Sequence, residues 1–380
     1  MGRLRLRTRR WLAVALVLVS LLGFTLLVLH RPTPQSSSRE QAPLRRELSV
    51  SLARNIRHRI SPRAFPAEAP PLRVGVQLKN VYNLQLDSQI FSADGWYWLS
   101  WNEELNTILE QERLKPAALL DFLNQVESWD ARIEPETDGP QRTDSGTYYQ
   151  VFRFSGRFYI DVIDEHRSPF SKVRLQVVME ARPESFSLSK HAVRLLPDPE
   201  MKVLVGNYGE LSGYHLERGW IEETTNTYRM SVQNNEETFS QLIVNVLYAS
   251  EPWTAFTKWV LPLLIVMTIV LLAPSLESSL GDMRLAIPST ALLTLVFMQQ
   301  TYKSELPAIP YLTFLDELYT YSYLVALGLF VLFLWSSNKL EAAPAEQKEA
   351  IRRRINRIDS ICQWSALGGL ILVGVLAWNL

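Results

Sequence analysis

The sequence predicts a multi-domain β + α membrane protein, in which an antiparallel β-sandwich outside the membrane is followed by a four-helix transmembrane bundle. Three observations predict this class. Short stretches of alternating polar and apolar residues recur between residues 72 and 252, as expected of half-buried strands. Four apolar segments close the chain, each about as long as a bilayer requires. A further apolar run, residues 11–29, predicts an extra hydrophobic helix at the amino end.

The first 30 residues carry signals of membrane targeting. Residues 3–10 are strongly basic and residues 11–29 are almost wholly apolar. The run is nearer in length to a spanning helix than to a signal peptide, and the residues after Leu29 lack a small-residue cleavage pattern. We expect residues 1–30 to be an uncleaved signal anchor, with a cleaved signal peptide as the alternative. Residues 31–71, rich in Pro, Ser, Arg and Glu, predict a linker.

The alternation of polar and apolar residues begins at Leu72 and predicts strands. Val74, Val76 and Leu78 point to one face, and the same pattern returns at 173–179 and 242–248. Turn-like clusters such as residues 137–140 separate these runs. We therefore expect an outer β-sandwich over residues 72–252. Residues 103–126 are the exception, because their leucine spacing suits a helix better than a strand.

The membrane domain is expected over residues 253–380, with helices at about 256–273, 283–302, 318–336 and 360–378. The basic amino terminus and the arginine-rich run 352–357 fall on the same side if all five apolar segments span. That side is the cytoplasm, so the β domain would lie on the extracellular or periplasmic side of the cell (inner) membrane. Residues 342–358 are expected to form a separate short amphipathic helix in the cytoplasm.

The second of these segments carries a polar stripe. A stripe of this kind inside a spanning helix needs polar or wet surroundings, because unsatisfied polar groups in hydrocarbon are costly. Symmetric copies of the helix around a water-filled axis would supply them. The alternative is a helix buried in a larger bundle, with its hydroxyls bonded back to backbone carbonyls. The stripe consists of Asp282, Ala286, Ser289, Thr290, Leu293, Phe297 and Gln300, at helical spacing.

Composition excludes several other functions. The 39 basic and 39 acidic residues balance to zero net charge, which gives no bulk attraction to nucleic acid. The single cysteine, Cys362, permits no intrachain disulfide, and the five histidines show no metal-ligand spacing. We expect no cofactor and no metal. Acidic residues of the outer domain, among them Asp94, Asp161 and Asp164, could make an acid–base site, but no catalytic motif accompanies them, so we expect no enzyme.

The stretch Leu306–Asp316 (LPAIPYLTFLD) resembles the loop between the second and third membrane helices of the pentameric ligand-gated ion channels, and more narrowly that of their prokaryotic Cys-loop-receptor homologues. Other stretches are similar to family elements: 94–101 to the second strand, 154–158 and 168–170 to the sixth strand and signature loop, and 259–262 to the first membrane helix. The lack of an extracellular cysteine places the chain with disulfide-free members. Ser171 stands where the family usually has aspartate.

The resemblance implies a homopentamer that conducts ions when a small molecule or protons act on the outer domain. Its expected partners are permeating ions, an unknown small-molecule agonist, membrane lipid and further copies of itself. Asp282 would select cations at the cytoplasmic mouth, and Leu293 would form the apolar gate. Ala286, Ser289 and Thr290 would line the lower pore, with Phe297 and Gln300 above. A membrane-anchored sensor of the same fold without a conducting pore is the alternative.

The resemblance also implies two further sets of residues. Aromatic side chains at subunit boundaries would hold a ligand such as an amine through cation–π attraction, although aromatic residues on half-buried strands more often belong to the core. Loop residues would couple the outer domain to the pore. The ligand-binding candidates are Trp98, Trp101, Trp129, Phe186, Tyr228 and Phe239, and the coupling candidates are Asp87, Pro169, Phe170, Pro307, Pro310 and Tyr311.

Overall fold

A computed structural model describes residues 57–58, 69–127, 132–161, 163–182, 193–230 and 235–379. The chain forms two compact units. The first, here the helical unit, comprises residues 1–34, 164–171 and 250–380, and the second, the β unit, comprises residues 35–163 and 172–249. The expected amino-terminal anchor, residues 1–30, lies outside the described residues.

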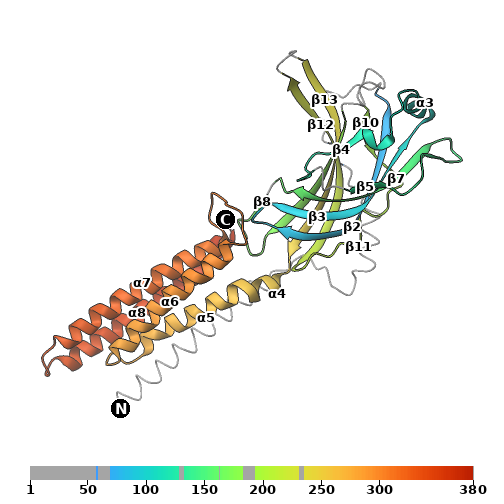
Figure 1. Cartoon of the computed structure of the whole chain (residues 1–380). Coiled ribbons are helices and arrows are strands. Elements are labelled where there is room, and N and C mark those ends of the chain that lie inside the picture. The colour runs from blue at the N-terminus through green and yellow to red at the C-terminus, as the bar shows by residue number, and fades with distance from the viewer. Residues whose placement is uncertain are drawn as a thin grey trace. The chain divides into compact units, whose positions relative to one another are not determined.

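Two sheets make up the β unit (Figure 1). The six-stranded sheet has the order β1 (Arg57–His58), β12 (Tyr214–Met230), β13 (Asn235–Ser250), β9 (Lys172–Ala181) and β4 (Leu120–Phe122), with β8 (Ile163–Asp164) beside β9. The seven-stranded sheet has the order β10 (Arg194–Pro197), β2 (Pro71–Gln85), β3 (Ile90–Trp101), β7 (Tyr148–Tyr159) and β5 (Arg132–Pro135). In that sheet β11 (Val205–Tyr208) pairs with β2, and β6 (Gln141–Arg142) pairs with β7.

The inward faces of the two sheets share one apolar core. Val74, Val76 and Leu78 of β2 are buried, as the alternation predicts, and so are the corresponding rows of β9 and β13. Tyr97 of β3 meets Phe122 of the other sheet edge-on, with ring centroids 5.6 Å apart. The predicted sandwich-like arrangement is therefore confirmed for the described residues.

The segment 103–126 is helical only in its first third, so the sequence-based expectation is wrong for the remainder. Helix α3 (Glu103–Gln111) is capped by Asn102, whose side chain accepts a hydrogen bond from the Leu105 amide. Arg113 adopts a left-handed backbone (φ 54°), and Pro116 opens the 3₁₀ turn η2 (Pro116–Leu119). The chain then enters β4, which pairs with β9. Pairing with a sheet edge outweighs the helical spacing of the leucines here.

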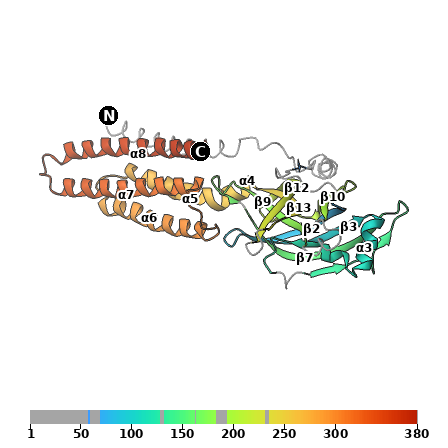
Figure 2. The same cartoon turned by 90° about the horizontal axis from the view of Figure 1, so that it is seen from above.

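Four helices within the described residues are long and apolar enough to cross a membrane, which indicates an integral membrane protein. The first, Pro252–Ser275, combines α4 (Pro252–Ala255), a π-helical turn η4 (Phe256–Val260), α5 (Leu261–Leu272) and a 3₁₀ turn η5 (Ala273–Ser275). The others are α6 (Gly281–Lys303), α7 (Phe314–Glu341) and α8 (Lys348–Asn379). Figures 1 and 2 show α5, α6, α7 and α8 lying side by side.

The last helix corrects a second expectation. Residues 348–358 are the first turns of α8, continuous with the spanning segment, and do not form a separate cytoplasmic helix. No glycine or proline interrupts the chain between Lys348 and Ala366. Ile355 and Asp359 are buried among the described residues, so packing also continues through this region. Both facts favour one uninterrupted helix.

Candidate functional site

One face of α6 is left uncovered by the other residues that the structure describes. All seven residues of the predicted stripe, from Asp282 to Gln300, are exposed, and the Leu293 and Phe297 side chains reach 58% and 64% exposure. Helix α6 runs through Pro288 without a break. The opposite face packs against the other helices through Arg284, Pro288, Ala291, Leu295 and Tyr302, which are buried.

Hydroxyl groups along α6 are bonded back to the helix, although the stripe itself is exposed. The Ser289 hydroxyl donates to the Leu285 carbonyl at 2.8 Å, and the Thr294 hydroxyl donates to the Thr290 carbonyl at 3.0 Å. These bonds satisfy the hydroxyl protons and leave the oxygen lone pairs available as acceptors. Ser289 of the stripe can thus present an acceptor oxygen to water or cations while its own proton is bonded within the helix.

The charge at the amino-terminal end of this face belongs to Asp282, because Arg284 points elsewhere. The Arg284 guanidinium lies 2.6 Å from an Asp359 carboxylate oxygen on α8, and the side chains are 1% and 2% exposed. The same guanidinium lies 4.2 Å from the ring centroid of Phe333 on α7. Arg284 therefore joins three helices in the interior and adds no positive charge to the stripe.

At the other end of α6, a buried carboxylate joins α6 to α7. Asp316 accepts hydrogen bonds from Lys303 at 2.6 Å and Gln299 at 3.1 Å. It also accepts from the Thr313 amide at 3.1 Å, which makes it part of the cap of α7. Glu305, just beyond α6, pairs with Lys258 at 2.8 Å, so both charges are locally balanced.

The helical unit contains a second feature, which we call the coupling joint: residues 164–171 together with residues 304–314. The His166 ring stacks on the Tyr311 ring, with centroids 3.8 Å apart and planes 3° from parallel. The Glu165 amide donates to the Tyr311 hydroxyl at 3.1 Å, and the Phe314 amide donates to the His166 carbonyl at 2.7 Å. These contacts hold the loop 164–171 against the connection between α6 and α7. We call the loop seated when it makes these contacts.

An aromatic cluster continues the joint towards α8. Phe170 lies 6.1 Å from Phe314 and 5.5 Å from Trp378, measured between ring centroids. Pro169 precedes Phe170 and follows a cis peptide bond. The structure thus brings together the coupling candidates Phe170 and Tyr311 with the segment that contains Pro307, which is buried, and Pro310, which is exposed. Asp87 lies in the turn between β2 and β3, in the β unit.

Two acidic residues of the joint have opposite electrostatic environments. The hydrogen bond from His166 holds the pKa of Asp164 below its ordinary value. Burial raises the pKa of Glu165 to about 6, more than the neighbouring Ser171 and Ser168 hydroxyls lower it. The sequence does not distinguish Glu165 from the other acidic residues of this region, because burial of a charged residue follows from tertiary packing.

In the β unit, Tyr228 and Phe239 form an edge-on pair with ring centroids 5.6 Å apart. The Tyr228 hydroxyl donates to Glu180 at 3.0 Å, and Gln241 donates to the same carboxylate at 2.5 Å. Glu180 is 6% exposed, and burial raises its pKa. Sequence reasoning missed Glu180, whose carboxylate accepts the hydrogen bond from the Tyr228 hydroxyl.

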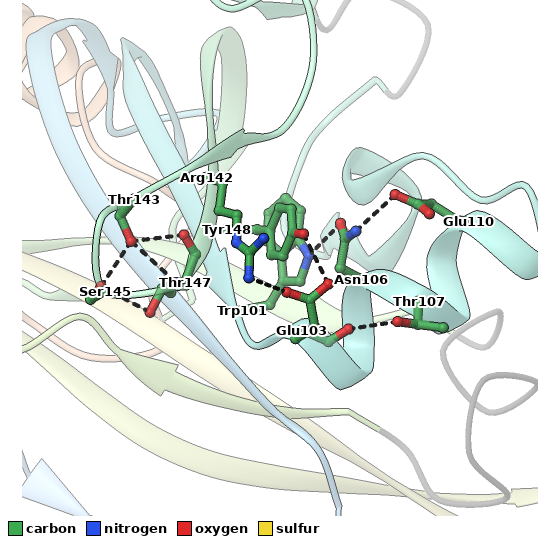
Figure 3. A network of polar contacts seen from close by, with 10 residues as sticks. All are labelled: Trp101, Glu103, Asn106, Thr107, Glu110, Arg142, Thr143, Ser145, Thr147 and Tyr148. Carbon is green, nitrogen blue, oxygen red and sulfur yellow. Dashed lines mark hydrogen bonds and ion pairs between the residues drawn. The ribbon is translucent and has the colours of Figure 1, made fainter.

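The two tryptophan candidates on β3 are engaged within the chain. Trp98 donates its indole N–H to Asp198. Trp101 is 2% exposed, and Figure 3 shows it in a network that includes Asn106 and Tyr148. Trp101 therefore serves as a packing residue at this end of the sandwich. Trp129 and Phe186 lie outside the described residues.

The sequence matches no protein-family model, and no curated protein is significantly similar to it. Within the part of the chain that the structure describes, no group of three His, Cys, Asp or Glu side chains is placed to hold a metal ion. The functional argument therefore depends on the geometry of the α6 face and the coupling joint.

Proposed function

We propose that the chain is a subunit of a ligand-gated ion channel, a cation-preferring homopentamer gated by a small ligand or protons acting on the β unit. The observation that carries the proposal is the exposed stripe on α6. Every stripe residue is uncovered, while the opposite face of the same helix is buried. A single chain with this helix has an incomplete membrane domain.

Lipid is a poor partner for that face. It carries Asp282, Ser289, Thr290 and Gln300, and polar side chains in hydrocarbon are costly. Copies of the helix arranged around a symmetry axis would place these groups against water and hide them from lipid. The apolar rung at Leu293 would then form a ring that closes the path by dewetting. The number five comes from the resemblance of Leu306–Asp316 to the pentameric channels.

The orientation follows from the basic residues. The exposed arginines near the start of α8, such as Arg353, would lie in the cytoplasm among lipid headgroups, with the β unit on the extracellular or periplasmic side. Single cysteines placed near Arg5 and Arg353, in a chain lacking Cys362, should both react with label from the cytoplasmic side. Reaction from opposite sides would show that the number of spans is wrong.

A ligand site is proposed around Tyr228 and Phe239. The ring of Tyr228 is 38% exposed, and its hydroxyl reaches the buried carboxylate of Glu180. The exposed face of Tyr228 suits a small amine, which gains cation–π attraction, and the negative charge of Glu180 at the Tyr228 hydroxyl favours a cation there.

The test is electrophysiology on the purified chain in planar bilayers, across pH 5 to 8 and a panel of small primary and quaternary amines. Unitary currents that depend on an amine or on pH support the proposal, and native mass spectrometry of the same sample should show five copies. Saturable amine binding without current at any pH would identify a membrane-anchored sensor. A stable monomer in every detergent would contradict the pore.

A further inference from the structure

We propose that Glu165 is a proton-binding site that regulates the channel, by controlling how firmly the loop 164–171 is seated on the connection between α6 and α7. This inference rests on the proposed channel function and deepens it. It assigns proton sensitivity to the coupling joint, whereas the proposed ligand site belongs to the β unit.

Geometry makes Glu165 unusual. Its side chain is fully buried (0% exposed), and its amide is held by the Tyr311 hydroxyl. Ser168 and Ser171 lie beside the carboxyl group, yet neither carboxylate oxygen has a hydrogen-bond partner of ordinary geometry among the described residues. A buried ionised carboxylate without such partners is strongly disfavoured, whereas the neutral acid tolerates the site.

No cation in the described part of the joint forms an ion pair with Glu165. On its own loop, Asp164 adds a negative charge, and His166 is engaged with Asp164. From the helices, the titratable groups nearby are already committed to each other. They are Lys303 with Asp316, Lys258 with Glu305, and Tyr302, whose hydroxyl shares a hydrogen bond with Thr313.

A hydrogen-bonded network at the end of α6 begins at Tyr302, on which Glu165 acts through its charge. Tyr302, at the last turn of α6, feels the charge of Glu165. Its hydroxyl lies 2.9 Å from the Thr313 hydroxyl, which donates to Asp316 at 3.0 Å. Asp316 in turn binds Lys303 of α6. A negative charge on Glu165 would act on these hydrogen bonds. It would also act on the contacts that hold the loop 164–171 against the connection between α6 and α7.

The direction of the effect follows from linkage. The seated loop holds the Glu165 pKa at about 6, against an ordinary value of 4.5. A loop that leaves its seat regains the ordinary value, so protonation favours the seated form. A difference of 1.5 pKa units changes the ratio of seated to unseated loop by up to about 30-fold per subunit. The seated form is therefore favoured as pH falls through 6.

The first experiment needs no channel activity. Hydrogen–deuterium exchange of the full chain in nanodiscs, corrected for the intrinsic effect of pH, is followed in peptides covering 163–172 and 304–316 between pH 4.5 and 8. Wild type should show slower exchange at acid pH with a midpoint near 6, and Glu165→Gln should show slow exchange throughout. Asp164→Asn removes a neighbouring negative charge that raises the Glu165 pKa, so a midpoint should remain but lie slightly below the wild-type value.

Two results would overturn the assignment: a midpoint that persists in Glu165→Gln, or one that disappears in His166→Gln while Glu165 is intact. Should Glu165→Gln fail to assemble, Glu165→Asp replaces it, and its midpoint should move away from the wild-type value. An unmoved midpoint in Glu165→Asp also overturns the assignment.

The second experiment measures currents. In wild type, the agonist concentration for half-maximal current should change several-fold between pH 7.5 and pH 5, and in Glu165→Gln it should not. Agonist currents with identical pH dependence in the two proteins would refute regulation by Glu165 and leave the channel intact. A complete lack of currents, with the exchange midpoint present, would refute the channel and leave the proton site.

Discussion

Arg284 and Asp359 form a fully buried ion pair between α6 and α8, with a guanidinium nitrogen 2.6 Å from a carboxylate oxygen. The pair lies within segments long and apolar enough to cross a membrane. It sits on the side of α6 opposite Asp282, which is exposed. One helix thus carries two charges of opposite sign two residues apart, and the fold sequesters the positive one.

We predict that Asp359→Asn destabilises the protein by about 3 kcal/mol, because removing one partner of a buried pair leaves an uncompensated charge. Thermal unfolding in detergent should show the loss. Replacing both residues with apolar ones, Arg284→Met with Asp359→Leu, should restore most of the stability. Arg352→Gln, which breaks the exposed pair with Glu277 (3.4 Å), serves as the control and should change little. Equal effects of Asp359→Asn and Arg352→Gln would contradict the prediction.

The second prediction concerns Leu293, the apolar residue proposed to form the closing ring of the pore. Leu293→Ser would wet the proposed ring, so opening should become easier and the agonist concentration for half-maximal current should fall. Several copies change together, so a small effect per side chain multiplies around the ring. Leu324→Ser, on α7 and of similar exposure (64%, against 58% for Leu293), should leave gating unchanged. Wild-type gating in Leu293→Ser would move the gate elsewhere, with Phe297 the next position to test.

Sequence patterns were sufficient for the elements that depend on local periodicity. The rows Val74–Leu78 and Val173–Met179 alternate because each strand buries one face, and that signal is local. The same applies to the apolar spans and to the exposed α6 stripe.

The contacts of the coupling joint and of the buried ion pair could not be predicted in this way. Glu165 and Tyr311 are 146 residues apart, and Arg284 and Asp359 are 75 apart. Each of these charged residues looks solvated in the sequence, because burial of a charge depends on which distant groups the fold brings to it. The helix expected over residues 103–126 ends at Gln111 for a similar reason, because the strand partner of β4, which is β9, is remote in the sequence.

The third prediction is a pH dependence in the β unit. Burial raises the pKa of Glu180 above its ordinary 4.5. Its contribution to stability is therefore fully present below pH 4.5 and is lost as pH rises through the raised value. In wild type, the free energy of local opening, measured by hydrogen exchange of β9 and β12 peptides, should fall as pH rises over that range. The fall should be much smaller in Glu180→Gln. It should be only slightly smaller in Asp121→Asn, because Asp121, a more exposed neighbour, makes a minor contribution to the raised pKa of Glu180. An identical fall in Glu180→Gln would place the titration elsewhere.

The last prediction concerns charge selection. Carboxylates gathered around a narrow axis raise the local cation concentration and repel anions, and low-dielectric walls strengthen that field. Asp282 is the only acidic residue on the exposed stripe of α6. Arg284 cannot offset it, because Asp359 and Phe333 hold the guanidinium in the interior. Glu305, at the other end, is balanced by Lys258 and should contribute little.

In a salt gradient, the wild-type reversal potential should therefore lie towards the cation equilibrium value. Asp282→Asn should lower cation conductance and shift the reversal potential towards anions, whereas Glu305→Gln should change both less, since it removes a charge that is already paired. Asp359→Asn offers a sharper check. Without its partner, Arg284 still lies against Phe333 on the face opposite Asp282, so the pore should stay cation-preferring, unlike that of Asp282→Asn. A wild-type reversal potential near the chloride equilibrium value would show that Asp282 does not select the ion, whatever the packing of Arg284.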